Sequence, residues 1–135
     1  MTTYDFLDGA GPVPAHQHSN GGGWVADSAQ VAASAFVGPD AKVYGNAVVR
    51  DNAWVYDNAR VFGNARVFGN AWVYGNARVF GRAWVWGNAR VSGNAVVCGT
   101  ARVYGYARVS GNALVCGNAV VGMRLDAESL KIVPL

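Results

Sequence analysis

The chain has 135 residues and a mass of 14.2 kDa, the size of a single domain. Hydrophobic residues make up 52% of it and charged residues only 14%, and its 18 glycines are typical of a chain with many corners. The formal net charge is +3, the first residues lack the features of a secretion signal, and no apolar run is long enough to span a membrane, so we expect a soluble, cytoplasmic protein.

Residues 1–22 are rich in proline and glycine, which favour an irregular arm over a helix or strand. This arm contains both histidines of the chain, His16 and His18. Neutral imidazole is a common metal ligand, so these two residues are the candidate metal ligands, although histidines in such an arm are usually solvated or packed. No other cofactor is indicated. Trp24, which follows the arm, is expected to cover the open end of the first repeat.

From residue 23 to residue 122 the chain repeats every six residues. A valine occupies every sixth position from Val25 to Val121, and an alanine stands two residues before each valine from Ala29 to Ala119. Such a short fixed period is typical of repeat architectures. Side chains alternate along a strand, so if the valines point inward, the alanines do too. The interior is then filled by valine and alanine and has no room for a ligand.

Glycine and asparagine between the units are expected to form corners, because they adopt the left-handed backbone conformation at least cost. Arg82, Thr100 and Tyr106 stand where asparagine otherwise follows the glycine. We favour the interpretation that the glycine takes the left-handed conformation and the next residue is free. The alternative is that Arg82 and Tyr106 are kept for contacts at an edge.

The units, which read Asn-Ala-x-Val-x-Gly, resemble the hexapeptide-repeat family. This resemblance implies an all-β fold, a single-stranded left-handed parallel β-helix with three hexapeptides per triangular coil and about five and a half coils. Members are commonly homotrimers. Residues 22–25 ahead of the array also resemble bacterial and phage proteins described as hexapeptide transferases, which implies a phage or mobile-element origin and a location in the host cytosol or virion.

In such a coil, outward residues eighteen apart stack in columns, about 4.8 Å between neighbours. Most aromatic residues then face outward, for example Phe36, Trp54 and Trp72 in one column. A lone prism of this kind would expose more apolar surface than a monomer usually tolerates. We therefore expect a homo-oligomer, with a trimer implied by the resemblance.

The outer surface is also strongly cationic, because no carboxylate lies between Asn58 and Leu125. An unbalanced cationic body favours an anionic partner or a face covered by another subunit. Arginine columns beside aromatic rings, such as Arg60 beside Phe62, are typical of sites for nucleotides, single-stranded nucleic acid or acidic glycans. The candidate ligand-binding residues are Arg60, Phe62, Arg78, Phe80, Arg82, Trp84, Trp86, Arg102 and Tyr106.

The repeat lacks the catalytic residues of the family. Hexapeptide acyltransferases use a histidine base, often with an inserted loop, and the related carbonic anhydrases bind zinc through three histidines, whereas residues 25–121 contain no histidine and no insertion. We therefore expect a non-enzymatic scaffold or binding protein. Two alternatives stay open: an acyltransferase-like enzyme, whose base would be a histidine from a neighbouring subunit's arm, and a protein that sequesters nucleotides.

Cys98 and Cys116 fall one coil apart in the same column. Their Cβ atoms would lie near 4.8 Å, slightly beyond the usual disulfide range, so we expect two packed thiols in a subunit contact rather than a bridge. After the repeat, residues 123–135 are predicted to form a polar cap, with one helical turn over residues 126–131 and an extended end.

Overall fold

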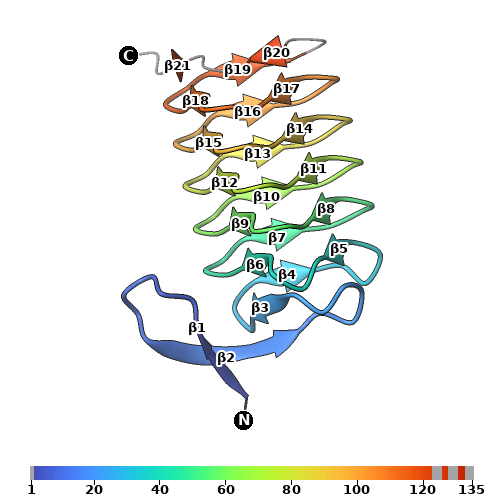
Figure 1. The fold of residues 1–135 in the computed structure, drawn as a ribbon, viewed down its shortest axis with the longest axis vertical. Coiled ribbons are helices and arrows are strands. Elements are labelled where there is room, and N and C mark those ends of the chain that lie inside the picture. The colour runs from blue at the N-terminus through green and yellow to red at the C-terminus, as the bar shows by residue number, and fades with distance from the viewer. Residues whose placement is uncertain (1, 123–125, 128–130, 133–135) are drawn as a thin grey trace.

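The computed structural model describes residues 2–122, 126–127 and 131–132, the last four by their backbone alone. In Figure 1 the chain rises as a stack of similar coils from a hairpin at the N-terminal end. Among the described residues every regular element is a β-strand, and no helix is long and apolar enough to cross a membrane. The expected all-β class is confirmed.

The strands of the repeat build three faces, one sheet to a face. The first face contains, in spatial order, β3 (Trp24–Ala26), β6 (Lys42–Val43), β9 (Arg60–Val61), β12 (Arg78–Val79), β15 (Val96–Val97), β18 (Leu114–Val115) and β21 (Lys131–Ile132). The second contains β4 (Gln30–Val31), β7 (Val48–Val49), β10 (Arg66–Val67), β13 (Trp84–Val85), β16 (Arg102–Val103) and β19 (Val120–Val121). The third contains β5 (Phe36–Val37), β8 (Trp54–Val55), β11 (Trp72–Val73), β14 (Arg90–Val91), β17 (Arg108–Val109) and β20 (Asp126–Ala127).

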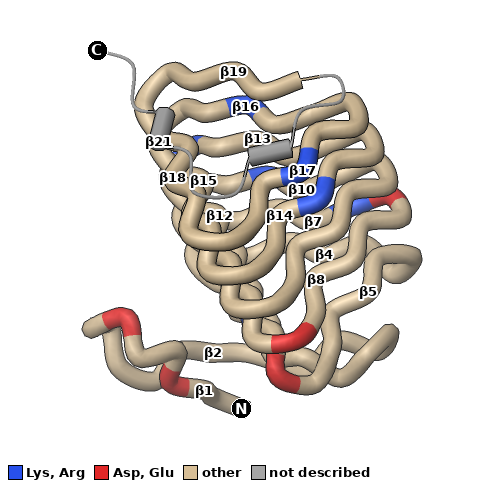
Figure 2. The backbone as a smooth tube through the Cα atoms, turned by 45° about the horizontal axis from the view of Figure 1, so that its top comes forward, with Lys and Arg blue, Asp and Glu red and all other residues tan. Residues whose placement is uncertain are grey.

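Successive strands of the chain belong to successive faces, and strands one coil apart pair in parallel. Arg60 pairs with Arg78 and Trp84 with Arg102, so the register step is eighteen residues. Seen together, Figures 1 and 2 show the three faces following one another with a left-handed turn. The left-handed parallel β-helix that the family resemblance implies is confirmed.

The interior contains the valine and alanine side chains. Every repeat valine from Val37 to Val115 is fully buried, as is every alanine from Ala35 to Ala107, whereas Val31 in the first coil is only partly covered. Burying a valine contributes about 1.5 to 2 kcal/mol, so the periodic pattern supplies the main stabilising term. Function therefore depends on the outer surface.

The corners follow the interpretation in which glycine alone is left-handed. Gly81, Gly99 and Gly105 have φ between 65° and 71°, while Arg82, Thr100 and Tyr106 after them do not have positive φ. Two corners use aspartate instead: Asp51 has φ 61° and Asp57 has φ 55°. Each aspartate carboxylate accepts the N–H of the glycine one coil later, Gly69 at 3.0 Å and Gly75 at 3.2 Å. This bond offsets part of the cost of a side chain in that conformation.

The N-terminal arm is not irregular, as the proline and glycine content had suggested. β1 (Thr3–Asp5) and β2 (Pro12–Gln17) form an antiparallel hairpin, and β2 also pairs with β3. The prolines of β2 lack an N–H but keep their carbonyl groups, and the carbonyl of Pro14 accepts the N–H of Asp27 at 2.9 Å. Proline is therefore compatible with this strand.

The arm covers strand edges at the start of the helix. Beyond the pairing of β2 with β3, the carbonyl of Asn20 accepts the N–H of Val37, and the N–H of Gly23 donates to the carbonyl of Val37, both at 3.0 Å. Trp24 lies on the outer side of the first face, stacked on Tyr4 with ring centroids 4.7 Å apart. The hairpin and residues 20–23, rather than Trp24, thus protect the first coil.

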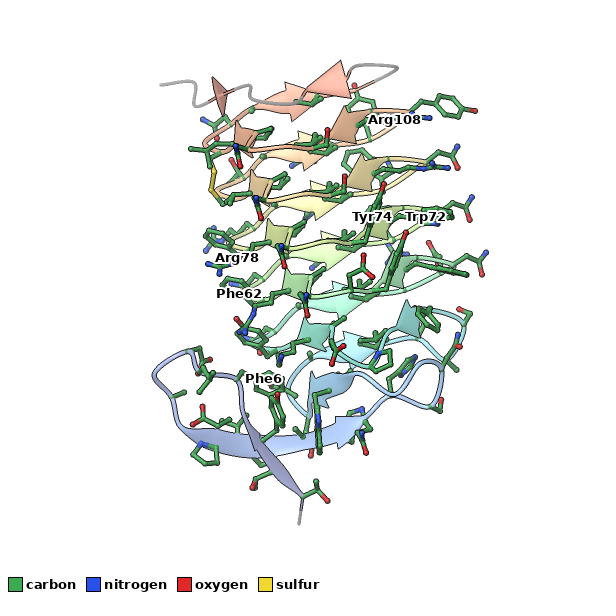
Figure 3. The ribbon with its side chains drawn as sticks, in the orientation of Figure 1. Phe6, Phe62, Trp72, Tyr74, Arg78 and Arg108 are labelled. Atoms are coloured by element: carbon green, nitrogen blue, oxygen red, sulfur yellow. A yellow bond between two sulfur atoms is a disulfide. The ribbon has the colours of Figure 1, made fainter. Side chains whose placement is uncertain are left out.

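The expectation of two free thiols is wrong: Cys98 and Cys116 form a disulfide. Their Cα atoms are 4.5 Å apart, inside the range that a disulfide spans, so their side chains can turn toward each other along the column and form the bond. The bond links the coils that contain β15 and β18 (Figure 3).

The predicted helical turn after the repeat is also wrong where the chain is described. Asp126–Ala127 pairs in parallel with β17, and Lys131–Ile132 pairs with β18. The open edges of β17 and β18 offer unpaired backbone groups, which strand pairing satisfies directly. The rest of that prediction, at residues 128–130 and 133–135, lies outside the described residues.

Candidate functional site

Aromatic rings on the outside stack in ladders along the columns. On the first face the ring of Phe62 lies between those of Tyr44 and Phe80, with centroids 4.8 Å from each. On the second face Trp86 lies between Phe68 and Tyr104, at 5.6 and 4.9 Å. The coil repeat sets this spacing, which is close to that of stacked rings. Ladder rings consequently present mainly their edges outward.

Arginines in the same columns as the aromatic residues place their guanidinium groups over the ladder rings. The guanidinium groups of Arg66 and Arg102 lie on either side of the Trp84 ring, 5.6 and 4.5 Å from its centroid. The guanidinium of Arg90 lies over Trp72 at 4.4 Å, and that of Arg50 over Phe68 at 4.4 Å. The cation–π contacts therefore run from coil to coil.

This geometry corrects one sequence-based expectation. Arg60 was expected to lie against the ring of Phe62 in the same coil, but the two faces of that ring are covered by Tyr44 and Phe80. Instead, Nη1 of Arg60 donates a hydrogen bond to the carbonyl oxygen of Phe6 at 3.1 Å. Arg60 is thus oriented by the hairpin.

Arg60 and Arg78 border a depression on the first face. It has a volume of about 240 Å³ and is lined by Leu7, Tyr44, Arg60, Phe62 and Arg78. The hairpin loop forms one wall, and there Leu7 has φ 60°, with its N–H bonded to the Asp5 carboxylate at 2.8 Å. Figure 3 labels Phe62 and Arg78, which project from this face above the hairpin. The sequence-predicted residues Arg60, Phe62 and Arg78 are brought together here.

Arg60 and Arg78 are paired in register one coil apart, a separation at which two like charges repel each other by about 1 kcal/mol even in water. Within the described side chains, the ion pairs closer than about 4 Å are His16 with Asp27 and Arg50 with Asp51. Figure 2 accordingly shows the acidic positions gathered near the N-terminal end and the basic ones along the coils. An anion between Arg60 and Arg78 would relieve their repulsion.

A second arginine pair was missed by the sequence analysis. Arg90 and Arg108 pair in register on the third face and, with Asn88 and Tyr106, line a depression of about 190 Å³. Tyr106 is one of the predicted ligand-binding residues. The eighteen-residue spacing that indicates Arg60 and Arg78 also relates Arg90 to Arg108, so it could have identified this pair. Nearby, burial and the phenol of Tyr74 raise the pKa of Tyr56 above its ordinary value of 10.0.

The nine predicted ligand-binding residues do not form one site. Arg60, Phe62, Arg78 and Phe80 lie on the first face, Trp84, Trp86 and Arg102 lie on the second, and Arg82 and Tyr106 are at corners. The predicted site is thus a set of separate surface positions.

The two histidines of the arm have protein partners. Nδ1 of His16 lies 2.7 Å from Oδ1 of Asp27, and His16 borders a depression of about 450 Å³ that also includes Arg50. His18 is buried, with Nε2 at 2.8 Å from the carbonyl oxygen of Ala35. Over the described part of the chain, no group of three or more His, Cys, Asp or Glu side chains is placed to hold a metal ion. Metal binding by His16 and His18 stays a prediction, to be tested by elemental analysis of untagged protein.

The repeat is similar to a known family model. The model described as the YdcK Beta solenoid repeat matches residues 53–69, 59–75, 83–99 and 107–122. No curated protein and no solved structure gives a significant match. The matched segments all lie in the stacked coils, so both similarity and structure describe the chain as a repeat β-helix scaffold.

Proposed function

We propose that the protein is a non-enzymatic, homo-oligomeric β-helix scaffold whose arginine and aromatic columns form subunit interfaces and hold an anionic ligand. The observation that carries the proposal is the pairing of arginines in register on two faces, Arg60 with Arg78 and Arg90 with Arg108. Such like-charge columns are stabilised when a neighbouring molecule supplies negative charge.

Self-association is supported by apolar side chains on the outside. Trp54 is 43% exposed and Val120 is 62% exposed. Aromatic residues and arginine are enriched in interface cores, and the resemblance to hexapeptide-repeat proteins favours a trimer.

Light scattering coupled to size-exclusion chromatography tests this part. We expect a particle with three times the mass of the chain, and Trp54→Glu should shift it toward the monomer if the third face is the interface. Gln30→Glu, at an exposed position on the second face, is the matched control. A monodisperse monomer across the whole concentration range would contradict the proposal.

Anion binding is supported because, among the described side chains, neither Arg60 nor Arg78 has a carboxylate within about 4 Å. Because both faces of the Phe62 ring are covered, by Tyr44 and Phe80, recognition by charge is favoured over stacking of a base on Phe62. The ligand classes that fit are a nucleotide, a single-stranded nucleic acid and an acidic glycan.

The test is calorimetry with an oligonucleotide and with heparin at several salt concentrations. We expect binding that weakens as salt rises, and about tenfold weaker binding by Arg78→Gln. Arg50→Gln is the control, because Arg50 has Asp51 as a partner at 4.0 Å. Salt-independent binding, or none, would remove this part of the proposal. A nucleotide-sequestering role predicts one bound nucleotide for every site and strong retention during purification. A phage origin stays a prediction from the resemblance.

The acyltransferase-like alternative is favoured by one contact, the exposed pair of His16 and Asp27. A carboxylate that orients an imidazole is the arrangement of a general base. In that case His16→Gln should abolish acyl transfer to an acceptor substrate and leave oligomer mass unchanged. A scaffold would show no transfer in either form.

A further inference from the structure

One aromatic ladder is extended by a ring from the hairpin, at a place where the column itself has a small residue. In the column of Tyr44 and Phe62, the preceding coil has the small residue Ala26, which is buried. The ring of Phe6, which comes from outside the repeat, lies on the free face of Tyr44 with centroids 4.8 Å apart and an interplanar angle of 19°. A small residue in a column thus leaves room for one ring supplied from elsewhere.

On the third face a small residue also adjoins a tyrosine pair, and within the described part of the chain no ring from elsewhere lies over that pair. Tyr56 and Tyr74 stack at 4.9 Å and 3°, and the next positions of their column are Ser92 and Ser110. Among the described residues, no aromatic ring or cationic group stacks on the face of Tyr74 that points to the following coil. We call this place, over Tyr74 and beside Ser92, the open ring position.

Several other ladder rings are covered at the corresponding place. Trp72 has Arg90 over it and Trp84 has Arg102, while Phe62 has Phe80. Tyr104 packs so closely on Gly122 that a Cβ there would lie 2.4 Å from its ring. The column of Phe80 continues with Cys98, which is bonded to Cys116, whereas the column of Tyr74 continues with two serines.

Its neighbours favour an anion. The guanidinium of Arg90, lying 4.4 Å over Trp72, is in the coil layer of the open position, and Arg108 follows in the next layer. Ser92 and Ser110 add hydroxyl groups that donate and accept hydrogen bonds. Figure 3 shows Trp72 and Tyr74 beneath Arg108 on the same side of the helix.

We propose that the open ring position is a binding site for a planar aromatic ring that carries an anionic group, with the ring stacked on Tyr74 and the anion held by Arg90 and Arg108. This inference deepens the proposed function by naming a site and a ligand class for anion binding. Arginine recognises phosphate and carboxylate through paired N–H donors, so an aromatic carboxylate and a nucleoside phosphate are both members of the class.

The experiment is calorimetry on the full-length protein with four probes. Adenosine 5′-monophosphate and benzoate carry both features, adenosine carries the ring alone, and ribose 5-phosphate carries the anion alone. We expect one or both of the first two to bind at least tenfold more tightly than the last two. Which of the two binds better distinguishes the phosphate source from the carboxylate source.

Variants locate the site. Tyr74→Ala should weaken binding by about tenfold to a hundredfold, since a base stacked on an aromatic side chain contributes that much, whereas Tyr74→Phe should keep it. Ser92→Phe should fill the position from within the chain, as Phe6 fills its own, and should abolish binding while raising the thermal unfolding midpoint. This last variant answers the concern that Tyr74→Ala simply unfolds the coil.

Arg78→Gln separates this inference from the broader proposal. If probes bind and are lost in Arg78→Gln but unaffected by Tyr74→Ala and Ser92→Phe, the surface holds anions and the open ring position is not the site. If no probe binds, and Ser92→Phe instead changes the oligomer mass, a ring of a second copy occupies the position and the ligand inference is overturned. Equal affinity for ribose 5-phosphate and adenosine 5′-monophosphate would also overturn it.

Discussion

The ring of Phe6 stacks on that of Tyr44 with centroids 4.8 Å apart, although one belongs to the hairpin and the other to the repeat. Phe6 is only 1% exposed, and its carbonyl oxygen accepts the Arg60 hydrogen bond. This contact fixes the hairpin on the first face and places the loop that borders the Arg60 and Arg78 depression.

Phe6→Ala should therefore free the hairpin. Removal of a buried phenylalanine costs about 3 to 5 kcal/mol, and coils stabilised by their neighbours lose stability locally first. We expect an earlier unfolding transition in urea and faster amide hydrogen exchange in β2. Leu7→Ala, at a side chain that is 78% exposed, is the control and should change stability by less than about 0.5 kcal/mol. Unchanged exchange in β2 would contradict the role of Phe6.

Asp51 tests the aspartate corner. Asp51→Gly loses the bond to the Gly69 N–H but relieves the left-handed conformation, whereas Asp51→Ala loses the bond and keeps the strain. We expect Asp51→Ala to be less stable than Asp51→Gly by about 1 to 2 kcal/mol in chemical denaturation. Equal stability of the two variants would mean that the backbone conformation contributes nothing at this corner.

The disulfide should stabilise the later coils. It closes a loop between residues separated by 18 positions, for which the chain-entropy model gives about 3 kcal/mol. A reductant should lower the thermal unfolding midpoint of the natural chain and should not affect the double variant Cys98→Ser with Cys116→Ser. Titration of two free thiols in the untreated native protein would show that the bond is not formed.

Stability should fall at alkaline pH in part through Tyr56. Its pKa is raised above 10.0 in the folded chain, mainly by burial, so the unfolded chain releases this proton first as the pH increases. The contribution is constant below about pH 10 and is lost as the pH rises through the folded pKa. When the free energy of unfolding is measured across this pH range, it should decrease less steeply for Tyr56→Phe than for the natural chain. Parallel curves for the two proteins would contradict the assignment.

The sequence predicts the fold well because every repeat makes the same local choice. The valine at each sixth position and the glycine at each corner act through contacts with identical neighbours, so periodicity alone places them. Phe6 belongs to no repeat, and its contact with Tyr44 depends on the path of the hairpin. The sequence did not predict that hairpin, because the proline content favoured an irregular arm.

The candidate site was predicted only in part for a similar reason. Stacking distances along a column are set by the coil repeat, so the columns of Arg60 and Arg78 were placed correctly. The direction in which a long side chain turns is set by its surroundings: Arg60 turns to the carbonyl of Phe6 and Arg90 turns over Trp72. The position over Tyr74 depends on the absence of a large side chain at Ser92, which a search for charged and aromatic residues does not find.

The uniform valine and alanine interior has one more consequence, for changes in chain length. Loss or gain of a single six-residue unit would leave the buried pattern undisturbed, yet every later residue would move to the next side of the prism, and Arg78 would no longer be aligned with Arg60. Only changes of eighteen residues keep the exterior in phase. The repeat length of the outer surface is therefore three times that of the core, and any role of the surface requires changes in chain length to preserve this longer repeat.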